Sequence, residues 1–237
     1  FGGRLRGTTL MRFYFEWINQ RLDYIALVLI LAVLAVLPIL PLSYLVTSFV
    51  IDDALYYPKI AANVTSGAGV SYDGFTQTNG VHPLWEILWI PLAGLAQQNS
   101  DLLLRLGFIM SAAVTGGAFT ICFLLFRRLG IHPYAITVSL LAMFFTRVDL
   151  WMSLMESALT FLLLATVLYI TIRGVQNNGP KFVISVVYGA AIAALFLARL
   201  DTVILAPVLM VATAYVWAGN WNLRARHLIV ISITALV

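Results

Sequence analysis

Long hydrophobic runs separated by short polar stretches make up most of this chain. The first run covers 24–50, and Pro38 and Pro41 should bend the helix that it forms. The later runs cover 83–96, 102–126, 134–148, 154–172, 182–197, 202–217 and 228–237. About 20 consecutive apolar residues are enough for a helix to cross a bilayer. The pattern therefore predicts an all-α fold, a polytopic transmembrane helix bundle.

The topology depends on whether the run 83–96 crosses the membrane. With about 14 residues it is shorter than the roughly 20 that a crossing needs, and it contains Glu86 and Pro91. If it lies in the outer interface instead, the later basic stretches all fall on the inner side, together with the N-terminal arginines. This agrees with the excess of Lys and Arg in cytoplasmic loops. The basic stretches are 127–128, 173–181 and 224–226. The same choice places every acidic residue after Val50 at the outer face. We therefore predict that 83–96 is a juxtamembrane helix.

The predicted layout has two parts. Residues 1–23 are basic and aromatic and form a cytoplasmic or interfacial segment, although 1–9 fit a partly ordered tail equally well. Residues 24–237 form one transmembrane module with a large outer loop, 51–101, and a short outer turn at Asp149. The chain starts without methionine and ends inside a hydrophobic run, so we expect it to be the N-terminal portion of a longer protein. The expected location is the plasma membrane, with the N-terminus in the cytoplasm.

Composition supports a membrane protein. The chain is 62% hydrophobic and 10% charged, whereas soluble domains carry about 25% charged residues. The net charge of +4 does not indicate nucleic-acid binding, because the basic residues gather at one predicted membrane face. Cys122 is the only cysteine and cannot form a disulfide within the chain.

Two adjacent carboxylates, Asp52 and Asp53, open the predicted outer loop. Carboxylate oxygens are the ligands that Mg²⁺ or Mn²⁺ prefers, and a carboxylate can also act as a general base, so both residues are catalytic and metal-binding candidates. A solvated helix exit or an N-cap of the next helix is the structural alternative. That next helix, 54–66, is amphipathic, and its Tyr56 and Tyr57 suit the membrane interface.

Other candidates lie further along the outer loop. Asn79-Gly80 marks a turn, and His82 and Glu86 follow at the start of the juxtamembrane helix. We group Asn79, His82 and Glu86 as substrate-binding candidates. A structural hydrogen bond is an equally good explanation of a lone histidine.

The predicted spans also carry charged candidates near the outer face. Glu156 is a catalytic candidate, since an intramembrane carboxylate is by default a functional-site hypothesis. The alternative is a residue that snorkels to the interface or forms an ion pair with Arg147 or Arg199. Arg199 and Arg105 are candidates for binding a lipid phosphate, because a planar guanidinium matches phosphate oxygens. For Arg199, an ion pair with Asp201 is at least as good an explanation.

Asp52-Asp53 followed by 78–85 (TNGVHPLW) resembles the first outer loop of the GT-C class. These membrane glycosyltransferases use polyprenyl-phosphate-linked sugars and include protein O-mannosyltransferases, the lipid A aminoarabinose transferase and cell-wall arabinofuranosyltransferases. An acidic residue of that loop is catalytic or binds metal in the class, which implies such a role for Asp52 or Asp53. Weaker matches are 155–159 (MESAL), similar to a second acidic motif, and 198–201 (ARLD), similar to an Arg-Pro-Asp motif with Leu200 in place of proline. The resemblance covers about 24–207.

The resemblance implies a glycosyltransferase that moves a sugar from a polyprenyl phosphate to a sugar, lipid or protein acceptor on the extracytoplasmic side. It also implies contact with membrane lipid and a possible divalent metal. A non-catalytic membrane subunit, packed beside larger partners, is the second hypothesis. The third is a transporter, which clustering of the acids at one face opposes.

Overall fold

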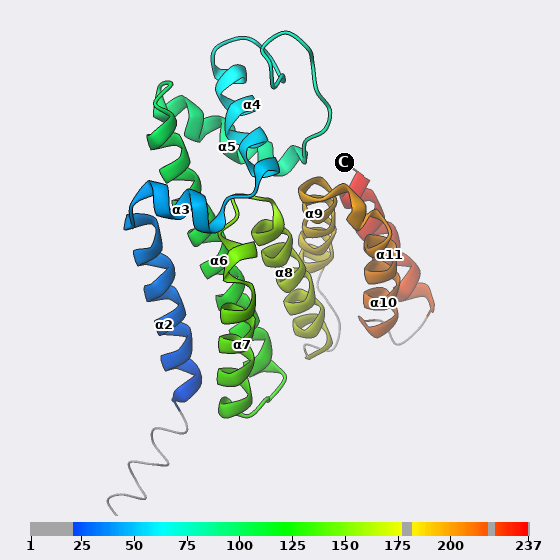
Figure 1. Ribbon diagram of the computed structural model, residues 1–237. Helices are drawn as coiled ribbons and strands as arrows, with labels where there is room; N and C mark the ends of the chain where they lie inside the picture. The colour runs from blue at the N-terminus through cyan, green and yellow to red at the C-terminus, as the bar shows by residue number, and fades with distance from the viewer. Residues whose placement is uncertain (1–20, 177–181, 218–220, 237) are drawn as a thin grey trace, which may run out of the picture.

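The computed structural model describes residues 21–176, 182–217 and 221–236, and these residues are helical wherever they have regular secondary structure (Figure 1). This confirms the all-α prediction for that part of the chain. Residues 1–20 of the predicted N-terminal segment and the loop 177–181 lie outside it. The helices, with η for 3₁₀, are α2 Leu22–Val36, η1 Leu37–Ile39, α3 Leu42–Phe49, η2 Asp52–Leu55, α4 Tyr56–Thr65, α5 Pro83–Ala96, α6 Ser100–Arg128, α7 Pro133–Trp151, α8 Ser157–Gln176, α9 Phe182–Ala198, η3 Leu200–Val203, α10 Leu205–Trp217 and α11 Trp221–Leu236.

Four helical segments in the described residues are long and apolar enough to cross a membrane. They are α2 with η1 (Leu22–Ile39), α6, α7 and α8. Helices α9, α10 and α11 are apolar but shorter. Each lies on one of the predicted hydrophobic runs. Helix α11 begins at Trp221, before the run that starts at Leu228, because the helix also includes the basic residues that precede the run.

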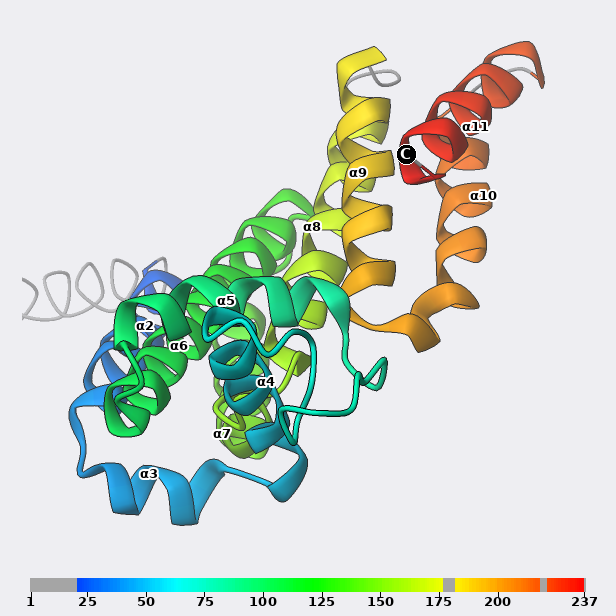
Figure 2. The ribbon, with the colours of Figure 1, turned by 90° about the horizontal axis from the view of Figure 1, so that it is seen from above.

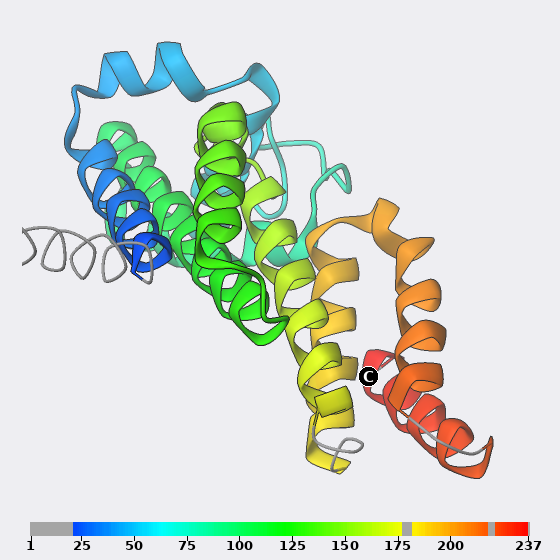
Figure 3. The ribbon, with the colours of Figure 1, turned by 90° about the horizontal axis from the view of Figure 1, so that it is seen from below.

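The prediction that 24–50 forms one bent span is wrong. Helix α2 ends at Val36, and Leu40 and Pro41 adopt extended backbone conformations. Proline disfavours helical geometry in the residue before it and cannot donate the next helical hydrogen bond. A separate helix, α3, then runs across the direction of α2 (Figures 1 and 3). Asp52 and Asp53 therefore follow α3 and do not mark the outer end of the first span.

Helix α5 has the predicted bounds and lies across one end of the long helices (Figure 2). Pro83 occupies the first turn, where a missing N–H costs nothing. Helix α5 packs closely on α6. The Trp89 ring of α5 fills the space that a Cβ atom at Gly107 of α6 would occupy. The short helix α4 packs beside α5, so both helices of the predicted outer loop cover the same end of the bundle.

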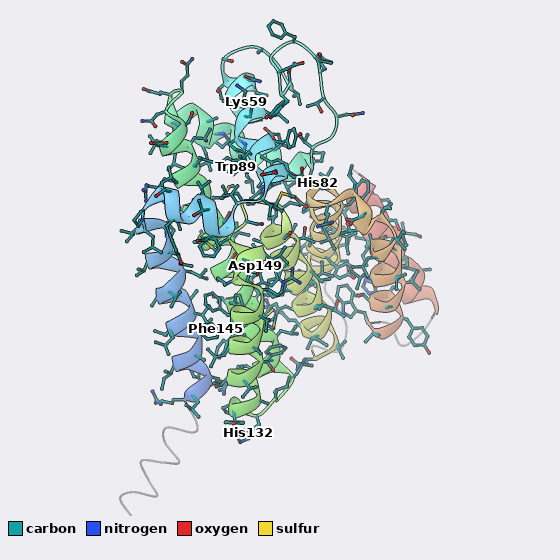
Figure 4. The ribbon with its side chains drawn as sticks, viewed as in Figure 1. Lys59, His82, Trp89, His132, Phe145 and Asp149 are labelled. Atoms are coloured by element: carbon teal, nitrogen blue, oxygen red, sulfur yellow. The ribbon has the colours of Figure 1, made fainter. Side chains whose placement is uncertain are left out.

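The opposite end holds the start of α2, the end of α6 and the start of α7. Arg127 Nη1 lies 3.2 Å from Oδ2 of the buried Asp23, and Arg128 hydrogen-bonds Tyr169 and Gln176. His132, which caps α7, lies at this end, far from His82 (Figure 4). Arg127 and Arg128 therefore lie at the end of the bundle opposite the helices of the loop 51–101, whereas Lys59 lies within that loop.

Asp149 lies inside α7 and not in an outer turn, so that prediction is wrong. Helix α7 continues to Trp151 through a kink at Arg147, whose φ of −141° and ψ of 25° are not helical. The connection to α8 is the segment 152–156, which contains Glu156. The polar residues Arg147 and Asp149 therefore belong to α7, and the chain turns only after Trp151.

Candidate functional site

A tight connection between α7 and α8 carries Glu156. Leu154 adopts a left-handed conformation with φ of +63°, which is uncommon for a residue other than glycine. Its carbonyl accepts a 2.9 Å hydrogen bond from the buried Trp85 Nε1 of α5. Helix α5 therefore holds this connection, and the Glu156 side chain is directed inward with 1% of its surface exposed.

Three side chains from separate segments meet the Glu156 carboxylate. Tyr57 of α4 donates its hydroxyl proton to Oε2 at 2.9 Å. Arg199, between α9 and η3, places Nη1 3.3 Å from Oε1, and His82 at the start of α5 places Nε2 3.5 Å from the same oxygen. We call these four residues the Glu156 cluster. Several partners for one carboxylate offset the cost of burying its charge.

Arg199 connects the cluster to solvent. Its Nε lies 3.0 Å from both carboxylate oxygens of Asp201, whose side chain is 64% exposed. Both structural alternatives foreseen for these residues, the Glu156–Arg199 and Arg199–Asp201 pairs, are therefore present. An apolar groove of about 410 Å³ lies beside Arg199 and Asp201, and its lining includes Phe161, Leu164 and Leu205.

Glu86 lies on the buried side of α5, one turn beyond His82. Its side chain is buried, and neither carboxylate oxygen has a hydrogen-bond partner among the described residues. Burial raises the pKa of Glu86 to about 7, because a charged carboxylate is disfavoured away from water. His82 Nδ1 and Trp89 Nε1, also on or beside α5, are likewise buried without a partner there. Figure 4 shows His82 and Trp89 along α5, with His82 beside the upper end of α9.

The pKa of Tyr57 is raised, first by burial and then by the negative charge of Glu156. Its hydroxyl therefore stays protonated and acts as a donor. Sequence reasoning assigned Tyr57 to the membrane interface and missed this role. The amphipathic pattern of α4 was the available signal, but the partner carboxylate lies 99 residues away along the chain.

Asp52 and Asp53 lie in η2, immediately before α4, and both are exposed. They have no hydrogen bond or ion pair with the Glu156 cluster in the described part of the chain. Within that part, no group of three or more His, Cys, Asp or Glu residues is placed to hold a metal ion. Two exposed carboxylates still offer the oxygen chemistry that Mg²⁺ or Mn²⁺ prefers. Their metal-binding and catalytic roles stay predictions.

The remaining candidates lie apart from the cluster. Asn79 is exposed in the loop before α5. Arg105 of α6 donates from Nη1 to the carbonyl oxygens of Pro38 and Leu40, at 2.6 and 3.2 Å. The structure therefore gathers His82, Glu156 and Arg199 from the candidates, with Glu86 close by on α5.

The loop between α4 and α5 has an ordered polar frame. Oδ1 of Asp73 accepts hydrogen bonds from the backbone N–H groups of Phe75 and Thr76 and from the Ser71 hydroxyl. These donors lower the pKa of Asp73. Asn63 Nδ2 donates to the carbonyls of Ser71 and Tyr72. These hydrogen bonds fix the conformation of the loop at 71–76 and join it to the last turns of α4.

Comparisons with protein-family models, curated proteins and solved structures gave no match to this chain. The relation to the GT-C class therefore stays a prediction from the sequence motifs.

Proposed function

We propose that this chain belongs to a membrane glycosyltransferase that moves a sugar from a polyprenyl phosphate to an acceptor hydroxyl, at the membrane face that carries the loop 51–101. The observation that supports this most is the buried Glu156 carboxylate, shared by Tyr57, His82 and Arg199. Buried charges are costly and gather at functional sites more often than elsewhere. This cluster lies at the helix ends, where a lipid-linked substrate can reach it from the bilayer.

In this proposal Arg199 binds the donor phosphate. Its guanidinium is partly exposed and adjoins the apolar groove of about 410 Å³, which suits a prenyl chain. Glu156 orients Arg199 and Tyr57. Because both oxygens of Glu156 are already engaged, it serves as a positioning residue.

The transfer itself needs a base and a stabilised leaving group. The acceptor oxygen forms a bond to the anomeric carbon, and the bond from that carbon to the phosphate oxygen breaks. The acceptor proton passes to Asp52 or Asp53, which are exposed and free of partners in the described chain. Arg199 stabilises the departing polyprenyl phosphate. A divalent cation held by Asp52 and Asp53 would neutralise further phosphate charge.

The test is sugar transfer by the purified full-length gene product from radiolabelled polyprenyl-phosphate sugars, with and without EDTA. The double variant Asp52→Asn, Asp53→Asn should lose about 10²-fold or more of the rate, as expected when a general base is removed. Asp101→Asn, which removes an exposed carboxylate from the first turn of α6, should retain native turnover. Loss of activity in EDTA would add the metal.

Full transfer by the double variant would contradict the assigned base. No transfer from any of several donor sugars, by a well-folded protein, would instead favour the non-catalytic membrane subunit. Stable association with larger membrane proteins would then be the next measurement.

A further inference from the structure

A second groove, separate from the Glu156 cluster, lies between α2 and α6. It has a volume of about 770 Å³, within the range of about 300–1,000 Å³ typical of ligand pockets. Leu34 and Pro38 line one side. Helix α6 forms the other side. Its middle stretch leaves room because it presents small residues there, namely Ala112, Ala113, Gly116 and Gly117, and Arg105, Ile109 and Thr120 line the groove on either side of that stretch.

Arg105 supplies the one charged side chain among the residues that line this groove. Two backbone carbonyls accept hydrogen bonds from its Nη1, while its Nε and Nη2 groups bond to none of the described residues. None of the described acidic residues forms an ion pair with it. A guanidinium has five N–H donors and a permanent charge, so Arg105 retains the capacity to bind an anion.

The groove has the dimensions of a lipid chain. Arg105 lies about one and a half turns after the start of α6, beside η1, the short helix that follows the end of α2. From Arg105 to Thr120 the lining of α6 extends about 22 Å at 1.5 Å per residue. One leaflet of the hydrocarbon core is about 15 Å thick, half of about 30 Å. A full acyl chain can therefore lie below a headgroup held at Arg105.

We propose that this groove binds a glycerophospholipid with a net negative headgroup. The phosphodiester accepts hydrogen bonds from Arg105, and one acyl chain lies along the small residues of α6. The unpaired positive charge selects an anionic over a zwitterionic lipid. The site is distinct from the proposed donor site, because the two grooves share no lining residue and no hydrogen bond or ion pair joins Arg105 to Glu156 or Arg199 in the described chain.

Native mass spectrometry of the purified full-length protein, incubated in detergent with phosphatidylglycerol or phosphatidylcholine, tests the proposal. We expect one phosphatidylglycerol to be retained preferentially. Arg105→Gln should weaken its retention about tenfold, the effect of one charge-assisted hydrogen bond. Ala113→Trp should do the same by filling the groove.

Two matched variants serve as controls. Arg147→Gln removes an exposed arginine of α7, and Ala142→Trp adds the same bulk to an exposed position of that helix; neither residue lines the groove. Both should retain phosphatidylglycerol as the native protein does. Equal retention of the two lipids, or native retention by both groove variants, would overturn the proposal. Displacement of phosphatidylglycerol by an equal concentration of polyprenyl phosphate would also overturn it, since the groove would then be a donor site.

Discussion

Two buried carboxylates at the same end of the bundle, Glu86 and Glu156, have opposite surroundings. Glu156 has three partners, which stabilise its charge. Glu86 has none among the described residues, and its pKa is raised to about 7 by burial alone. At the residue scale, Glu156 is thus held by polar partners, whereas Glu86 gains or loses a proton near neutral pH.

Glu86 should make the protein less stable as the pH rises from about 4.5 to about 7. In that window the native state keeps a proton that the unfolded state has released, so the free energy of unfolding falls with pH. A shift of this size corresponds to about 3 kcal/mol at most. Thermal unfolding in detergent between pH 4 and pH 8 measures this slope.

Glu86→Gln should flatten the slope and raise the unfolding temperature at pH 8. Asp101→Asn keeps Glu86 and should therefore keep the slope. An identical pH dependence in native protein and Glu86→Gln would show that Glu86 does not titrate in this window.

At the element scale, the position of α5 depends on one close helix contact. The Trp89 ring of α5 occupies the space where Gly107 of α6 lacks a Cβ atom. The same helix supplies Trp85, which holds the carbonyl of Leu154 beside Glu156. Packing between α5 and α6 therefore positions the Glu156 cluster.

Gly107→Ala should destabilise the protein by about 1–3 kcal/mol, the usual effect of overpacking a close contact. Gly94→Ala in α5 is the matched control. A Cβ atom at Gly94 meets nothing within 4 Å, so this change should be neutral or stabilise the helix by up to about 1 kcal/mol. Chemical denaturation of the two variants measures the difference. Equal stabilities would mean that α5 moves away from α6 without cost.

At the scale of the whole molecule, the two ends of the bundle differ in charge and in covering. The loop 51–101 covers one end, and Arg127 and Arg128 lie at the other. The positive-inside rule then predicts that the loop lies outside the cytoplasm.

Cysteine labelling tests this orientation. In a Cys122→Ala background, Asn79→Cys should react with a membrane-impermeant maleimide in intact cells. Leu129→Cys, in the turn between α6 and α7, should react only after lysis. Both native side chains are exposed on the protein, so a difference in labelling reports the side of the membrane on which each residue lies. The reverse pattern would contradict the predicted topology.

Local patterns in the sequence determined the helices and several of their ends. The bounds of α5 follow from Pro83 at its start and the polar residues after Ala96, and the long apolar runs specify α6, α7 and α8. These features depend on neighbours within a few turns, where propensity and hydrophobic pattern act.

Only the tertiary structure decided which polar residues meet. The sequence does not show that Tyr57 reaches Glu156, or that α3 separates Asp52 and Asp53 from the first span. Such contacts depend on packing between helices, including the Gly107–Trp89 approach. Packing joins residues that are distant along the chain, and a buried charge is stable only where these distant partners converge. The sequence identified Glu156, His82 and Arg199 as candidates and offered a Glu156–Arg199 ion pair as one alternative. Helix packing joined all three with Tyr57 into one cluster.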